Sequence, residues 1–298
     1  MNFVFTDEQR LFQRTVRDYL EKACSPAALR AMNAQGESWS PERWKGLADL
    51  GVVGLTVPEA HGGLGKDELD LVLILEEAGR AALPEPLVET MVAVPFLADW
   101  AEMEGDRLRQ IAAGEVAVSY ERPAAGSFEI RFQSSPGESI HGIAGVEASL
   151  GGGDPAFDRG AFGTAAYLCG IADRVIEMAA AYAKERHQFG KPIGSFQAVK
   201  HLLADALLSL EFARPAVYRA AWSIAKDEPT RECDVSMAKA LASDAAVNAC
   251  RAALQVHGAI GYTHEHDLHL WLTKGFSLAQ AWGTASWHRE RVANAVLG

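Results

Sequence analysis

The stretch ERHQFGKPIGSFQAV, residues 185–199, sets the architecture of the C-terminal half. Gly190, Pro192 and Gly194 interrupt the helical pattern that precedes and follows them, so one long helix ends here. Ser195 is placed to cap the next helix. The stretch therefore predicts a tight corner between two bundle helices, which presents its side chains at one fixed place.

Two side chains of this corner suit a phosphorylated ligand. Arg186 offers a permanent cation with a rigid fork of donors, the preferred partner of a pyrophosphate, and Phe189 adds an apolar surface beside it. Taken alone, Arg186 also fits a surface arginine whose charge meets the negative end of a helix dipole. Other segments decide between these two interpretations.

Apolar residues at helical spacing predict long helices on both sides of the corner and shorter ones elsewhere. Thr6 followed by DEQ is typical of a capping box and begins the first helix. Glu76 and Glu77 are interpreted as the solvated face of a helix, and residues 52–65 as a loop. The other expected helices are 26–33, 41–50, 69–78, 84–101, 106–113, 157–186, 195–226, 232–257, 266–274 and 283–297.

The middle of the chain has a different texture. Between Glu115 and Leu150, the β-prone runs VAVSYE and FEIRFQ alternate with Pro, Gly and Ser. This pattern predicts a small patch of strands, too small to be an independent domain.

Composition excludes several classes of protein. The net charge of -11 repels phosphate backbones, and no basic run relieves it, so no nucleic-acid partner is expected. No apolar run approaches the roughly 18–20 residues of a membrane span. The four cysteines are far apart without CxxC spacing, which favours neither disulfides nor zinc and fits a reducing, cytoplasmic location.

Taken with a second segment, the corner closely resembles the RxxFG…FQ signature of acyl-CoA dehydrogenases. Residues 255–262, QVHGAIGY, resemble that family's Q-x-F/H-G-G-x-G-Y/F turn, with Ala259 in place of the second glycine. FTDEQ, the stretch from Trp44 to Gly51 and VPEAHGGLG resemble its N-terminal helical domain.

The resemblance implies a mainly α fold with three parts. These are an N-terminal helical domain at 1–113, a strongly truncated β segment at 114–153 and a C-terminal four-helix bundle domain at 154–298. The family's larger β domain, with its TEP-x-AGSD-like string, is absent.

The resemblance also implies FAD as the cofactor. In the family, the arginine corner and the glutamine turn reach across a subunit interface to the neighbour's FAD, whereas the β domain holds the subunit's own flavin ring. This chain keeps the first set and lacks most of the second. The implied cofactor-binding residues are Arg186, Gln188, Phe189, Gln197, Gln255, Gly258, Ala259 and Thr284.

The family's catalytic glutamate has no counterpart at its usual place. Ungapped alignment from Gln255 puts the YEGTS turn on residues 281–285, where Trp282 replaces the glutamate and has no basic lone pair. The family's alternative position falls on Gly160. Shifting the alignment by two residues would place Asp158 there, which makes it a weak candidate for the base. Because Trp282 replaces the usual glutamate, no catalytic residue is assigned.

Three functional hypotheses follow from the resemblance. The first is a non-catalytic subunit of a hetero-oligomeric acyl-CoA dehydrogenase, similar to the shorter subunit of heterotetrameric, steroid-catabolic actinobacterial enzymes. In an α2β2 heterotetramer, a longer partner subunit would carry most of the acyl-CoA site. An electron-transfer flavoprotein would accept the electrons released by α,β-desaturation. The second is a homodimeric pseudoenzyme that binds no flavin. The third is an active homo-oligomer that uses Asp158 as its base.

Two remaining features receive structural interpretations. His264, His266 and His269 do not form an HExxH zinc motif, because Leu268 stands where its second histidine belongs. A solvated loop leading into a helix is expected there, with no metal. Trp271, Trp282 and Trp287 are expected to pack in the bundle, with Trp282 as a plug of a vestigial site in one interpretation.

Overall fold

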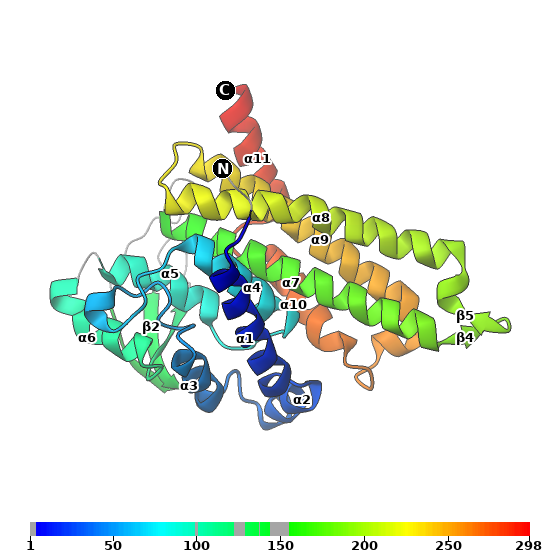
Figure 1. Ribbon diagram of the computed structural model, residues 1–298, viewed down its shortest axis with the longest axis horizontal. Coiled ribbons are helices and arrows are strands. Elements are labelled where there is room, and N and C mark those ends of the chain that lie inside the picture. Colours follow the sequence, from blue (N-terminus) through cyan, green and yellow to red (C-terminus); the bar gives the residue numbers. More distant parts are fainter. Residues whose placement is uncertain (1–3, 99–100, 122–128, 137, 144–154) are drawn as a thin grey trace.

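Long antiparallel helices form the centre of the fold in the computed structural model, which describes residues 4–98, 101–121, 129–136, 138–143 and 155–298. They lie side by side in Figure 1, and α10 packs against two of them, as expected for a four-helix bundle. A final helix, α11, follows and packs on α9. Their bounds are α7 Pro155–Glu185, α8 Gln197–Ala225, α9 Arg231–His257, α10 Leu268–Gln280 and α11 Ala285–Leu297.

Shorter helices form the N-terminal part, in which α4 packs against α7 and α8, and α5 packs against α7. The predicted capping box is present: the Thr6 hydroxyl accepts from the Gln9 amide nitrogen, and the Gln9 side chain accepts from the Thr6 amide. Pro26 and Pro41 begin the next two helices, as their sequence positions predict. The bounds are α1 Asp7–Ala23, α2 Pro26–Gln35, α3 Pro41–Asp49, η1 Glu59–His61, α4 Glu68–Arg80, α5 Leu87–Ala98 and α6 Ala101–Ala112.

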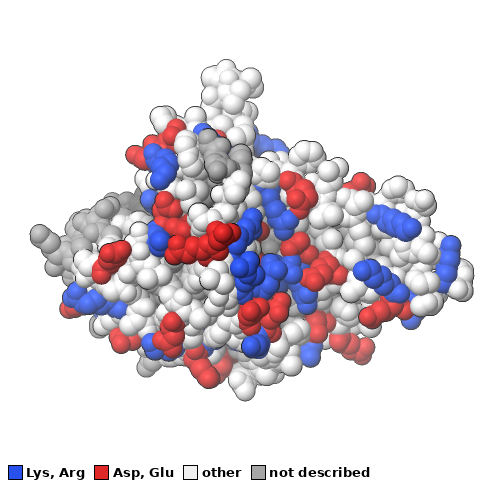
Figure 2. Space-filling view, in the orientation of Figure 1, with Lys and Arg blue, Asp and Glu red and all other residues white. Residues whose placement is uncertain are grey.

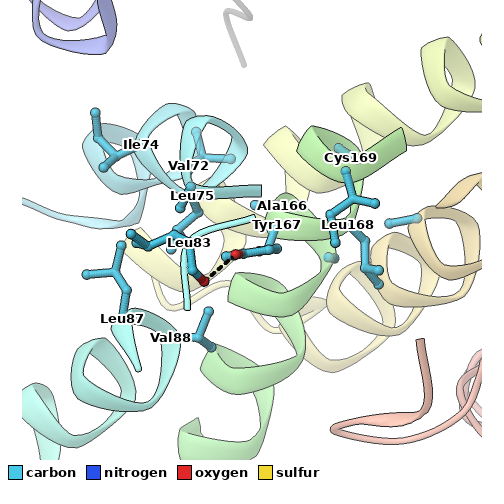
Figure 3. Close-up of a cluster of buried hydrophobic side chains, with 14 of the residues drawn as sticks. Val72, Ile74, Leu75, Leu83, Leu87, Val88, Ala166, Tyr167, Leu168 and Cys169 are labelled. Carbon is cyan, nitrogen blue, oxygen red and sulfur yellow. Dashed lines mark hydrogen bonds between the residues drawn. The ribbon is translucent and has the colours of Figure 1, made fainter. Parts of the chain in front are cut away.

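Two glycines let α4 cross α7 with their backbones almost in contact. A Cβ atom at Gly79 would lie 1.9 Å from the Tyr167 carbonyl oxygen, and one at Gly170 would lie 1.9 Å from the Glu76 carbonyl oxygen. Beside the crossing, the Tyr167 hydroxyl donates to the Leu83 carbonyl at 2.6 Å within a buried apolar cluster (Figure 3). This crossing fixes the N-terminal helices onto the bundle.

The expectation that Glu76 and Glu77 face solvent is wrong. Both are buried, because α1 covers one side of α4 and α7 with α8 covers the other. Glu77 pairs with Arg17 at 2.6 Å, and Glu76 lies 3.6 Å from Arg214. Burial raises the pKa of Glu76 to about 7 against the opposing effect of Arg214. On the face of the molecule drawn in Figure 2, Lys and Arg side chains alternate with Asp and Glu near the middle.

Strands in the middle segment form a small antiparallel sheet in the order β1-β2-β3. The two predicted strands correspond to β1 Ala117–Glu121 and β2 Glu129–Ser135, and a third strand, β3 Glu138–Ile143, was not predicted. The sheet is tied to the helices where the Val118 amide donates to the Thr90 hydroxyl at 3.0 Å. Residues 122–128, 137 and 144–153 of the predicted segment lie outside the described residues.

A search of the described helices for a membrane span finds none of sufficient length and apolar character.

The helix crossing yields a stability prediction. Gly170→Ala should lower the free energy of unfolding by about 2–4 kcal/mol, because the new methyl group meets the α4 backbone, which has no room to move. Urea unfolding followed by circular dichroism measures it. Gly163→Ala on the same helix is the control, since its nearest contact is a Val88 methyl at 3.1 Å. Equal stability of the two variants would contradict the close crossing.

Candidate functional site

The corner after α7 is a small hairpin. Strands β4 His187–Gln188 and β5 Lys191–Pro192 pair with each other, and Phe189 and Gly190 form the two-residue loop with φ of 54° and 78°. Two positive φ values in succession are the signature of a type I′ turn. The Phe189 side chain is 92% exposed at the tip. The corner was predicted, but its hairpin form was not.

Ser195 does not cap α8, contrary to expectation. Helix α8 begins at Gln197 with Phe196 as the preceding residue, and neither supplies a side-chain cap. The Ser195 hydroxyl instead donates to the Pro192 carbonyl oxygen at 2.7 Å and closes the short turn η2, Ile193–Ser195. Gln197 is exposed at the start of α8, beside the hairpin.

The corner is cationic on an acidic chain. Residues 184–201 contain four Lys or Arg and one Glu, a local balance of +3 against -11 overall. Within the described part of the chain, none of these four cations forms an ion pair; they are Lys184, Arg186, Lys191 and Lys200. An unpaired guanidinium beside an exposed aromatic ring matches the chemistry that holds a pyrophosphate.

The glutamine turn lies at the same end of the bundle. Helix α9 ends at His257, Gly258 follows with φ of 64°, and the turn η3 spans Gly258–Tyr262. The His257 ring stacks on Tyr182, in the last turn of α7, at 4.5 Å between ring centroids. The structure therefore brings the turn next to the corner. Both Gln255 and Ala259 are exposed there.

Thr284 is not brought together with the other candidates. Its hydroxyl accepts from the Trp287 amide at 3.2 Å and caps α11. Trp287 packs on Phe157 at the start of α7, with ring centroids 5.1 Å apart. The corner lies at the far end of this helix, roughly 40 Å away at 1.5 Å per residue. Thr284 and Arg186 of one chain therefore cannot contact the same nucleotide.

The two positions at which the family places its base touch each other. A Cβ atom at Gly160 would lie 2.4 Å from Cδ2 of the Trp282 indole, so the ring occupies the space of any side chain at 160.

Two buried polar side chains hold the turn that carries Trp282. The Lys239 ammonium donates to the carbonyl oxygens of Ala279 and Gly283, both at 3.2 Å, and burial lowers its pKa to about 8. His288 Nε2 lies 2.8 Å from the Trp282 carbonyl oxygen, and its Nδ1 lies 3.1 Å from the Ser236 hydroxyl. Sequence reasoning missed both residues; a lysine among alanines within a buried helix was the available signal.

Asp158 is fully buried between two arginines. Arg231 Nε lies 3.1 Å from one carboxylate oxygen, and Arg291 Nη1 lies 3.3 Å from the other. Burial raises its pKa, although both arginines oppose this. A carboxylate with both oxygens occupied and no exposed surface ties α7 to α9 and α11.

The histidine tract forms the approach to α10. His264 is exposed, whereas His266 is half-buried with its ring 4.5 Å from that of His257. Among the described residues, no group of three potential ligands is arranged to hold a metal ion. Of the three tryptophans expected to pack in the bundle, Trp271 is buried, and Trp282 and Trp287 are half-buried against Phe157.

Comparisons with known proteins cover most of the chain. Residues 6–115 match the family model described as acyl-CoA dehydrogenase, N-terminal domain, and residues 155–297 match acyl-CoA dehydrogenase, C-terminal domain. Acyl-CoA dehydrogenase IpdE2 of Mycolicibacterium smegmatis is 31% identical and aligns over 93% of this chain and 95% of its own length.

Solved structures show the same fold. A chain of the ChsE4-ChsE5 complex from Mycobacterium tuberculosis gives a TM-score of 0.83 at 20% identity, with 100% of this chain and 99% of that chain covered. A chain of the Tcur3481-Tcur3483 steroid ACAD G363A variant gives 0.82 at 23% identity, with 98% of each chain covered.

The buried His288 yields a pH prediction. Burial lowers its pKa from 6.5 to about 4, so the unfolded state binds a proton that the folded state does not between those values. The wild type should therefore lose up to about 3 kcal/mol of stability to this group as pH falls from 6.5 to 4. His288→Gln should lack this part of the loss in urea unfolding at several pH values.

The exposed His201 supplies the control for this measurement. His201→Gln should keep the wild-type pH profile. A His288→Gln profile parallel to that of the wild type would show that the buried imidazole does not govern the acid sensitivity.

Proposed function

The chain belongs to the acyl-CoA dehydrogenase family, and from that membership we propose that it is a subunit of a hetero-oligomeric, FAD-dependent acyl-CoA dehydrogenase. It contributes contacts to the nucleotide end of FAD, and a longer partner supplies the flavin-ring domain and the catalytic base. One observation carries the proposal: the nucleotide-binding corner is open and cationic, whereas the base position is filled by Trp282 against Gly160.

The corner fits the diphosphate of FAD. Arg186 is exposed and unpaired within the described residues, and the side-chain amides of Gln188, Gln197 and Gln255 add neutral donors close to it. Gly258 has nothing within 4 Å of the place where a Cβ atom would stand, so its backbone is open to a ligand. When bound, FAD would supply the hydride acceptor of α,β-desaturation; this chain's residues bind and orient its nucleotide end.

Charge complementarity favours an anionic ligand at the corner. The chain as a whole repels anions, so a nucleotide must find local cations, and the corner gathers four of them. Phe189 at the tip offers a ring face for apolar or aromatic contact. The negative charges of the FAD diphosphate would therefore pair with corner cations that have no ion-pair partner in the described chain.

The proposed lack of a base rests on chemistry and on sterics. The Trp282 indole has no group that could accept the α-proton, and it occupies the space of any side chain at position 160. The alternative carboxylate, Asp158, is committed to two arginines. Proton abstraction is thus assigned to the partner. The electrons of the reduced flavin would then pass to an electron-transfer flavoprotein.

The substrate class is proposed from the relatives. The Tcur3481-Tcur3483 protein is a steroid ACAD, and the ChsE4-ChsE5 structure is a complex of two different chains. We assign this chain to an α2β2 heterotetramer acting on a bulky, steroid-derived acyl-CoA. Co-expression with the product of a neighbouring gene, native mass spectrometry and visible absorption test the assignment.

The alternative function is a homodimeric pseudoenzyme without flavin. A colourless protein that associates only with itself, whichever neighbouring product is co-expressed, would favour this alternative. A yellow complex of two chains with one FAD at each mixed interface would favour the heterotetramer.

Removing the corner cation should weaken cofactor retention. Arg186→Ala deletes a charge-assisted contact, which corresponds to a roughly tenfold or greater loss of FAD affinity. The ratio of flavin absorption to protein after gel filtration of the complex measures it. Arg14→Ala on α1, also exposed, is the matched control. Unchanged flavin content in the Arg186 variant would remove this residue from the site.

Asp158→Asn tests the assignment of the base to the partner. Two half-buried arginines lose their fully buried carboxylate partner, so the melting temperature should fall. The turnover number of the complex, assayed well below that temperature, should stay the same. A catalytic base would instead show a loss of about 100-fold or more, with flavin content unchanged.

A further inference from the structure

A cleft lined by polar and apolar side chains separates α2 of the N-terminal part from α10 of the bundle. Its volume is about 740 Å³, within the usual range of ligand sites. One wall is α2, which contributes Arg30, Asn33 and Ala34, and the other is α10 with the preceding loop. None of the residues that line it is acidic; those on the second wall are His264, His269, Leu270, Thr273, Lys274, Ser277 and Leu278.

Several donors in this cleft have no partner within the described chain. The side chains of Asn33, His264, Thr273 and Ser277 make no hydrogen bond to any other described residue. Arg30 forms an ion pair with Asp267 across the two walls, but a guanidinium has five N–H donors, so others stay available. Lys274 is different: its ammonium turns inward to the Leu83 carbonyl oxygen, so only its stem lines the cleft.

Apolar side chains also line the walls of the cleft. They are Ala34 on α2 and Leu270 and Leu278 on α10, and the His264 and His269 rings meet edge to face with centroids 4.9 Å apart. Guanidinium, imidazole, hydroxyl and amide groups together are the donors that recognise a phosphate. Apolar lining among such donors suits an organic body attached to that phosphate. The acidic groups nearby are Asp267, which Arg30 neutralises, and the exposed Glu265.

We propose that the cleft between α2 and α10 binds an organic phosphate, the adenosine phosphate of a free nucleotide or of coenzyme A, and that the ligand joins the two walls. The site is separate from the FAD corner, since neither Arg186 nor Gln255 lines it. It does not depend on the proposed FAD role. Its position between two parts of the fold is a common one for ligand sites, and occupancy would brace α2 against α10.

Calorimetric titration of the Arg186→Ala chain tests the proposal, because that background removes the nucleotide corner from the measurement. The probes are inorganic pyrophosphate, ADP and coenzyme A. We expect submillimolar binding and a rise in melting temperature. Binding by ADP as tight as by coenzyme A assigns the site to free nucleotides, and tighter binding by coenzyme A assigns it to that cofactor's phosphorylated end.

Variants of the cleft locate the binding. Arg30→Ala and His264→Ala should each weaken it about tenfold, whereas Arg14→Ala should not. The His264→Ala variant should fold normally because this side chain is exposed, so weaker binding by it would not reflect unfolding. The proposal is overturned if none of the three probes binds at millimolar concentration, or if the cleft variants bind them as tightly as the control.

Discussion

The length and rigidity of α7 constrain everything that this chain can contribute to catalysis. The helix has 31 residues, or about 45 Å at 1.5 Å per residue. Its N-terminal end carries Gly160 under the Trp282 indole, and its C-terminal end leads into the hairpin with Arg186. Much of it is buried against α4, α8 and α9, so the two ends cannot approach each other. A nucleotide bound at the corner would not reach the Trp282 end of the same chain, which is why we propose that a second polypeptide completes the cofactor site.

The two ends of α7 also differ in what they leave unsatisfied. At the base end, Asp158 is enclosed by Arg231 and Arg291, and Lys239 has only carbonyl and hydroxyl acceptors, all supplied by the chain. At the corner, the four cations have no ion-pair partner within the described chain, and the Phe189 ring is exposed. At the Trp282 end the polar groups are already paired within the chain, whereas binding an anion would stabilise the open, cationic corner.

Sequence reasoning succeeded where local physics decides the structure and failed where distant elements do. The capping box at Thr6, the proline starts of α2 and α3 and the end of α9 at Gly258 follow from neighbouring residues. Glu76 and Glu77 looked solvated because their helix has mixed character, and only the arrangement of α1 and α8 shows that they are buried. The contact of Trp282 with Gly160 joins residues far apart in the chain, so alignment named both positions without predicting that they meet.

Under the proposed function, that contact explains how the fold accommodates a tryptophan at the position proposed for a base. A buried carboxylate without a partner is costly, and a void in its place is costly too. An indole over a glycine fills the space with apolar surface and leaves no unpaired charge. The turn beneath it holds Trp282 at φ of 54° and Gly283 at 90°, and Lys239 and His288 stabilise this backbone through its carbonyl oxygens. These contacts are made to backbone carbonyl oxygens and therefore do not depend on the side chain at position 282.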